Sequence, residues 1–159
     1  MPRKPNFKKR PTTPDSKFSS VDVALFINRM MTRGKKSLAE RLFYSALDII
    51  ETKIKDKPSV DVFRKAVENV TPVVKVKARR IGGATYQVPE PVDRLKGNAI
   101  AHRWIIQSAR KRSAKTFTQN LANELLEAFE NKGKAIELKE HTHKMAEANK
   151  AFAHYAKSM

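Results

Sequence analysis

The residues best suited to chemistry lie between Val73 and Val88, where two β-prone runs flank Gly82-Gly83. A glycine pair between such runs predicts a tight hairpin, because both central residues can take positive φ. A two-residue turn places Arg79 opposite Tyr86 and Lys77 opposite Val88. One face of the hairpin then carries three cations and an aromatic ring, namely Lys75, Lys77, Arg79 and Tyr86.

Like charges repeated along one hairpin face repel one another, and an isolated two-stranded hairpin is barely stable in water. A polyanion lying against this face would relieve the repulsion. A planar tyrosine among the cations favours a nucleic acid, which offers phosphates and stackable bases together. The alternative is a solvated hairpin whose cations only keep the protein soluble.

The composition bounds the class of protein. The 159 residues suffice for one domain with a core, and 40% of them are apolar. A formal net charge of +17 is usually relieved by a polyanionic partner. The absence of cysteine excludes disulfides, cysteine catalysis and thiolate metal sites. The chain contains no run of about 18 apolar residues, so no membrane span is predicted. Proline occupies the region where a signal peptide would have its apolar core, so no signal peptide is predicted. We expect a soluble intracellular protein.

The charge is unevenly spread along the chain. From Asn69 to Asn123 only Glu90 and Asp93 are acidic, against eleven lysines and arginines. This asymmetry predicts one binding face rather than a uniform cationic coat.

The N-terminal stretch, Met1–Ser20, is rich in proline and basic residues. Its four prolines prevent a helix, so we expect a tail that is disordered when free and follows phosphates when bound. The alternative is a tail that only confers solubility. The predicted organisation is a basic flexible tail over residues 1–18, which binds a nucleic acid, and a helical domain over residues 19–159.

Apolar periodicity predicts three helices before the hairpin. The first begins at Ser19, with Asp22 as its capping-box partner, and Gly34 closes it. The second opens with a capping box of Ser37 and Glu40 and runs to about Lys53. The third has Ser59 as its cap and is stopped by Pro72.

Three further helices are predicted after the hairpin, where Pro89 and Pro91 should break the strand. The fourth helix spans about Val92 to Arg112 and carries an apolar arc of Leu95, Ala99, His102, Ile106 and Ala109. Its basic arc comprises Lys96, Arg103, Gln107, Arg110 and Lys111. Trp104 lies at the edge of that arc, where it either stacks on a base or packs into the core. The run Arg110-Lys111-Arg112, with Lys115, continues the patch.

The fifth helix spans Thr116 to about Asn131 and opens with a capping box of Thr116 and Gln119. The sixth runs from Ile136 through Tyr155. The predicted fold is therefore mainly α: a single-domain bundle of about six helices, with one protruding basic β-hairpin at about 73–89 between helices three and four.

No catalytic constellation is found. His141 and His143 are spaced i, i+2 and point to different sides of a helix, so they do not suit a zinc site. Gly82-Gly83 lacks the G-K-[ST] of a phosphate loop, and no serine lies in a nucleophile elbow. We expect no enzyme activity, no metal and no cofactor.

Several segments carry a family resemblance when taken together in order. They are Gly34-Lys35-Lys36, Tyr44-Ser45-Ala46-Leu47, Ala66-Val67-Glu68-Asn69-Val70, Arg79-Arg80-Ile81-Gly82-Gly83-Ala84-Thr85-Tyr86-Gln87-Val88-Pro89, Arg103-Trp104-Ile105, Leu121-Ala122-Asn123-Glu124 and Lys144 through Tyr155. With these segments the chain closely resembles, over almost its whole length, the bacterial-type S-seven family of small-subunit ribosomal proteins.

The resemblance implies a helical domain with a projecting hairpin. It implies direct binding to the 3′ major domain of small-subunit rRNA and nucleation of head assembly. It also implies a place near the exit site, contacting tRNA and the mRNA path, beside neighbouring ribosomal proteins of the head and platform. No membrane and no small-molecule substrate are expected, and the implied location is the ribosome of the cytoplasm or of a plastid. Some bacterial members of the family repress translation of their own mRNA, but the resemblance does not extend this activity to the present chain.

The RNA-binding residues expected on these grounds are Arg3, Lys4, Lys8, Lys9, Arg10, Lys35, Lys36, Lys75, Lys77, Arg79, Arg80, Gly82, Gly83, Tyr86, Arg94, Lys96, Arg103, Arg110, Lys111, Arg112, Lys115, Lys144 and Lys150. The chain departs from the family at two points. Lys75 stands where an acidic residue is common, and the fourth helix opens with Asp93-Arg94-Leu95-Lys96-Gly97 instead of several arginines.

Two other functions are weighed against RNA binding. An architectural DNA-binding protein can also reach along a duplex with a basic β-arm, although such arms usually carry an apolar wedge at the tip. An RNA-modifying enzyme is opposed by the missing catalytic group and cofactor motif.

Overall fold

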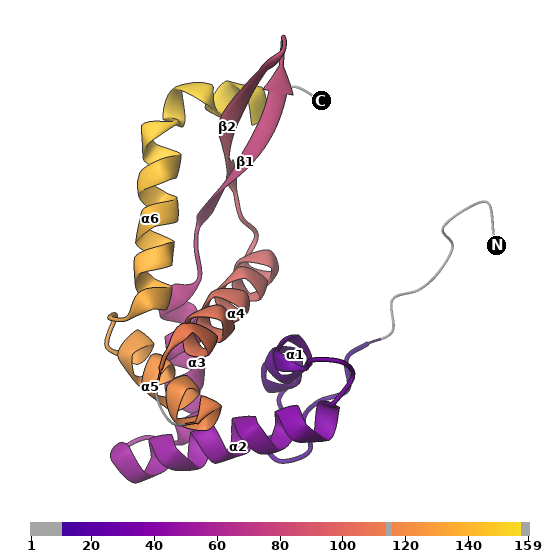
Figure 1. Cartoon of the computed structure of the whole chain (residues 1–159), viewed down its shortest axis with the longest axis vertical. Coiled ribbons are helices and arrows are strands. Elements are labelled where there is room, and N and C mark those ends of the chain that lie inside the picture. The colour runs from indigo at the N-terminus through magenta and orange to yellow at the C-terminus, as the bar shows by residue number, and fades with distance from the viewer. Residues whose placement is uncertain (1–10, 114–115, 157–159) are drawn as a thin grey trace, which may run out of the picture. The chain divides into compact units, whose positions relative to one another are not determined.

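The computed structural model describes residues 11–113 and 116–156. The chain divides into two compact units, one up to Glu40 and one from Arg41 onward. Over the described residues the element order is α1, α2, α3, β1, β2, α4, α5, α6 and a 3₁₀ helix, η1 (Figure 1). The predicted mainly helical fold, with one hairpin between the third and fourth helices, is confirmed. The tail predicted over residues 1–18 lies largely outside the described residues and stays a prediction.

In the first unit, α1 spans Val21–Met30 and buries Val23, Phe26 and Ile27. The predicted capping box at Ser19 and Asp22 is wrong, because Ser19 lies outside the helix with a φ of 48°. Before it, the buried Asp15 carboxylate accepts hydrogen bonds from the main-chain N–H groups of Lys17 and Phe18 and forms a turn.

The link between the first two helices also differs from the prediction. Helix α1 ends at Met30, because Met31 already has an extended ψ of 136°. Gly34, with a φ of 74°, therefore belongs to the turn before α2 and does not close α1. Helix α2 spans Lys36–Lys53, so Ser37 lies within its first turn and is not its cap.

The core of the second unit is built from α2, α3 (Ser59–Val70), α4 (Arg94–Lys111), α5 (Phe117–Phe129) and α6 (Lys134–Ala148). Fully buried side chains come from each of the first four of these, as in Phe43, Phe63, Ile105 and Leu125. The Phe43 and Phe63 rings meet edge to face with centroids 5.3 Å apart, an arrangement that aromatic pairs prefer.

Two predictions about α4 and α5 are tested by burial and capping. Leu95 was placed on the apolar arc of α4 but is 77% exposed, because the first turn packs against the end of α3 through Gly97, which is buried against Thr71. His102, by contrast, is buried beside Phe63, as expected. At α5, Thr116 accepts a hydrogen bond from the Gln119 N–H at 3.3 Å, which confirms that cap.

The sixth predicted helix is two helices. Helix α6 ends at Ala148, and η1 spans Lys150–Ala156 and packs against β2 (Figure 1). At the junction the Asn149 side chain donates a hydrogen bond to the Met145 carbonyl at 2.8 Å. Asn149 thus satisfies a terminal carbonyl of α6 and ends the regular helix.

Strands β1 (Val74–Ile81) and β2 (Ala84–Pro91) form an antiparallel pair. Pro89 and Pro91 were expected to break the strand, yet both lie within β2, opposite Val76 and Val74. Counted from the turn, these are positions whose N–H points away from the partner strand, so a proline removes no ladder hydrogen bond. Consistent with this alternation, the Val92 N–H donates to the Val73 carbonyl at 2.9 Å.

Candidate nucleic-acid interface

The hairpin has the turn and register that the glycine pair predicts. Gly82 and Gly83 have φ values of 56° and 89°, and Arg79 pairs with Tyr86. A Cβ atom at either glycine would meet nothing within 4 Å, so positive φ, not space, requires glycine here. Arg80, on the opposite face from Arg79, is exposed.

The cationic face of the hairpin contains a carboxylate that the sequence analysis missed. Glu90 lies opposite Lys75 in the register and therefore on the same face. Its carboxylate accepts a hydrogen bond from Arg79 at 2.8 Å and pairs with Lys75 at 3.3 Å. The Arg79 hydrogen bond holds the pKa of Glu90 below its usual value, against the opposing effect of burial. Counting the register outward from the glycine pair would have found Glu90.

The same face also packs inside the protein. The Tyr86 ring contacts Phe152 and Tyr155 of η1, with centroids 5.0 and 5.8 Å away. Val88 is fully buried, and Arg79 donates to the Tyr155 carbonyl at 3.1 Å. Part of the face that was expected to be open is thus covered by the C-terminal 3₁₀ helix.

Helix α4 supplies the most continuous exposed cationic surface. Its sequence contains no acidic residue, and its predicted basic arc is exposed throughout. Lys96, Arg103 and Arg110 are spaced seven residues apart, two helical turns, and so share one side of the helix. The opposite side buries Ala101, Ile105 and Ala109 in the core, which holds the cations outward.

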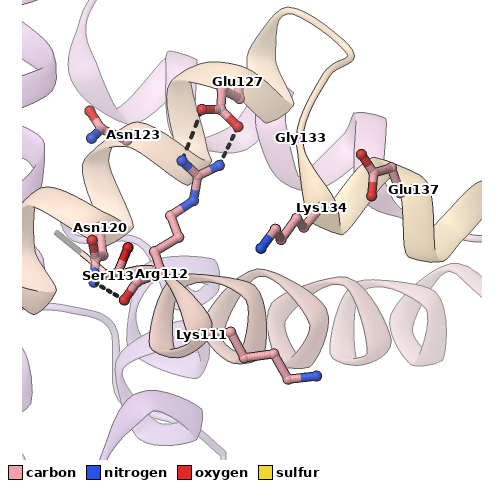
Figure 2. Close-up of a pocket in the computed structure, with 9 residues that line it drawn as sticks. All are labelled: Lys111, Arg112, Ser113, Asn120, Asn123, Glu127, Gly133, Lys134 and Glu137. Atoms are coloured by element: carbon pink, nitrogen blue, oxygen red, sulfur yellow. Dashed lines mark hydrogen bonds and ion pairs between the residues drawn. The ribbon is translucent and has the colours of Figure 1, made fainter.

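Arg112 was predicted to bind RNA, but its guanidinium is bound to two carboxylates, of which Figure 2 shows that of Glu127. It donates to Glu124 at 2.6 Å and forms a two-bond contact with Glu127. Glu124 is fully buried, and its other oxygen accepts from the Ala135 N–H at 2.9 Å. Figure 2 shows Arg112 reaching from the end of α4 to α5. A hollow of about 700 Å³ lies beside it. These bonds tie α4, α5 and the start of α6 together.

The other predicted cations fall into three groups. Lys35 and Lys36 of the first unit are exposed, and Lys36 pairs with Glu40 at 3.7 Å. Lys77, Arg94, Lys144 and Lys150 of the second unit are exposed as well. Five tail residues and Lys115 lie outside the described residues, namely Arg3, Lys4, Lys8, Lys9, Arg10 and Lys115.

The histidines of α6 do not form a metal centre. Among residues 11–113 and 116–156, no group of three or more His, Cys, Asp or Glu side chains is placed to hold a metal ion. The His143 Nε2 accepts a hydrogen bond from the Val73 N–H at 3.3 Å. Burial, with a smaller effect of Lys139, lowers the pKa of His143. Within the same ranges no helix is long and apolar enough to cross a membrane.

A helical core, a projecting hairpin and an exposed cationic helix define a class, the small basic structural proteins that bind nucleic acid. A family model described as "Ribosomal protein S7p/S5e" matches residues 2–150. The chain belongs to this family, and it is a structural protein of the small ribosomal subunit and not an enzyme.

Individual relatives are similar along their whole length. The chain is 55% identical to the small ribosomal subunit protein uS7 of Syntrophobacter fumaroxidans, over 98% of this chain and 99% of the relative. It is 52% and 51% identical to the proteins of the same name from Desulfotalea psychrophila and Marinobacter nauticus, with the same coverage.

Proposed function

We propose that this protein binds the 3′ major domain of small-subunit rRNA directly and nucleates assembly of the subunit head. The observation that carries the proposal is the exposed stripe of cations on α4, a helix without a single carboxylate. Duplex RNA hides its base edges in a deep groove, so such a stripe suits phosphates and 2′-hydroxyl groups. Family membership supports the choice of ribosomal RNA.

The geometry narrows the set of contacting residues. Lys77 and Arg80 on the hairpin and Lys96 and Arg103 on α4 are exposed and are proposed to contact phosphates. Arg112 is left out of this set because its guanidinium already binds two carboxylates of this protein, those of Glu124 and Glu127. Tyr86 is left out because its ring packs on η1.

The proposal includes a place near the exit site, with the hairpin close to tRNA and the mRNA path, on the cytoplasmic ribosome. It also includes contacts with neighbouring proteins of the head and platform. Family membership supports these finer assignments.

The test is a filter-binding titration of the isolated 3′ major domain at several salt concentrations. An unrelated structured RNA of equal length and a DNA duplex serve as competitors. We expect a preference for the cognate domain of about a hundredfold, on the order of 3 kcal/mol. Equal affinity for all three nucleic acids would reduce the protein to a generic polyanion binder.

A variant series tests the α4 surface. The double variant Lys96→Gln/Arg103→Gln should flatten the salt dependence by roughly one unit per lost phosphate contact. Lys132→Gln is the matched control, because Lys132 is exposed but pairs with Glu130 at 3.3 Å. If the salt dependence of binding is identical in the double variant and the wild type, α4 does not contact the RNA.

A further inference from the structure

A second groove lies between α4 and α6 and has a volume of about 420 Å³. Residues at helical spacing line both of its walls. On α4 these are Trp104, Gln107 and Lys111, and on α6 they are Lys134, Leu138 and His141. Side chains three or four positions apart share one side of a helix, so two continuous stripes face each other across the groove. The volume falls within the range of about 300–1,000 Å³ typical of small-molecule sites.

The Trp104 side chain lines this groove and is partly buried, in contrast to the fully buried core residues. The indole makes no hydrogen bond and no ring contact with the residues in the described ranges. Leu138, on the facing wall, is 39% exposed. A tryptophan usually buries its ring and finds a partner for its N–H. The partly exposed Trp104 ring and the exposed Leu138 together give the groove an apolar surface that a planar ligand can cover.

The charges around the groove indicate what it takes up. Lys111 and Lys134 are exposed on its two sides, and Glu137 is the one carboxylate in its lining. Figure 2 shows the same two lysines, one from α4 and one from α6, beside the neighbouring hollow. Lys111 also belongs to the cationic arc of α4, so the groove continues the proposed RNA surface. Apolar side chains on both walls, with a cation on each side, suit an aromatic base joined to phosphates.

We propose that Trp104 stacks on an unpaired RNA base that enters the groove between α4 and α6. Lys111 and Lys134 contact the phosphates that flank this base. The Gln107 amide, which both donates and accepts hydrogen bonds, faces the base edge. The inference rests on the proposed function of binding rRNA, and it adds a single-base site to a surface that otherwise holds phosphates.

The wild-type protein tests this directly, because Trp104 is the single tryptophan of the chain. Its fluorescence is followed while the 3′ major domain is titrated, and filter binding is measured in parallel. We expect quenching and protection from acrylamide, with the same midpoint as filter binding. Binding with unchanged emission and unchanged acrylamide quenching would overturn the inference and leave the proposed function standing. That result is also expected if the groove takes a side chain of a neighbouring protein. No filter binding would overturn both proposals.

Two substitutions at one position separate stacking from packing. Trp104→Leu should weaken binding about tenfold, because it removes the ring on which the base stacks. Trp104→Phe keeps a ring and should retain most of the affinity. Thermal unfolding of both variants shows whether the fold is intact. Equal affinities of the two folded variants would overturn the inference.

Lys134, one of the two lysines assigned to the groove, is tested against a matched control variant at Lys132. Lys134→Gln should reduce the salt slope by about one unit, whereas Lys132→Gln, two residues away and paired with Glu130, should not. Equal slopes for the two variants would exclude Lys134 from the phosphate contact.

Discussion

The Arg79 guanidinium donates a hydrogen bond to the main-chain carbonyl of Tyr155 at 3.1 Å, joining residues 76 positions apart. The same guanidinium pairs with Glu90 at 2.8 Å. The hairpin is therefore held by the C-terminal 3₁₀ helix as well as by its own ladder. This contact explains how a two-stranded sheet, which is marginal by itself, keeps a defined shape.

The first prediction concerns this docking. Phe152→Ala removes a ring that packs on Tyr86 at 5.0 Å and should loosen the hairpin by about 1 kcal/mol. Amide hydrogen exchange should accelerate in β1 and β2, while protection of α3 and α5 stays unchanged. Unchanged exchange in the strands would show that η1 does not support the hairpin. Lys150→Ala, at an exposed position of the same helix, is the control.

The second prediction concerns Arg112 and its two carboxylates. Arg112→Met leaves the fully buried Glu124 without its cation, which should cost about 3–5 kcal/mol of unfolding free energy. Urea denaturation measures the loss. The double variant Arg112→Met/Glu124→Leu should recover part of it, because the fully buried carboxylate is then gone and Glu127, which also loses Arg112, is 40% exposed to water. A single variant as stable as the wild type would contradict the structural role of Arg112.

The third prediction concerns Gly133, which has a φ of 90°. A Cβ atom there would lie 2.8 Å from Glu127 Oε2, and that carboxylate is held by Arg112 and cannot easily move. Gly133→Ala should therefore cost about 1–3 kcal/mol in thermal unfolding. Gly34→Ala is the matched control, since Gly34 has a φ of 74° but nothing within 4 Å. A larger loss at Gly34 would refute the steric argument.

The fourth prediction is a pH dependence at His143. Burial lowers the pKa of His143 in the folded protein, and its Nε2 must be unprotonated to accept from the Val73 N–H. The unfolded state therefore binds a proton first as the pH falls below about 6.5. The free energy of unfolding should be constant above that pH and should decrease below it, until the folded histidine also titrates.

His143→Gln keeps an acceptor for the Val73 N–H but does not titrate. The free energy of unfolding, measured by urea denaturation at pH 7.5 and at pH 5.5, should therefore differ less between the two pH values for this variant than for the wild type. An identical difference in both proteins would assign the pH dependence to another group.

The amino-acid sequence by itself determined the local structure. Gly82-Gly83 sets the turn and hence the register of Arg79 with Tyr86, because both depend only on adjacent residues. The buried stripes of the helices also follow from periodicity, since one repeat places every third or fourth residue on the core side.

Only the tertiary structure decided which faces stay open. Leu95 shares the apolar arc of α4, but the first turn packs against the end of α3 through Gly97, so Leu95 is exposed. Arg79 and Tyr86 have the side chains of an RNA-binding face, yet η1 packs on them after the chain changes direction at Asn149. These outcomes depend on contacts between segments far apart in the chain. A local pattern specifies which residues share a face, and the packing of distant segments determines what covers that face.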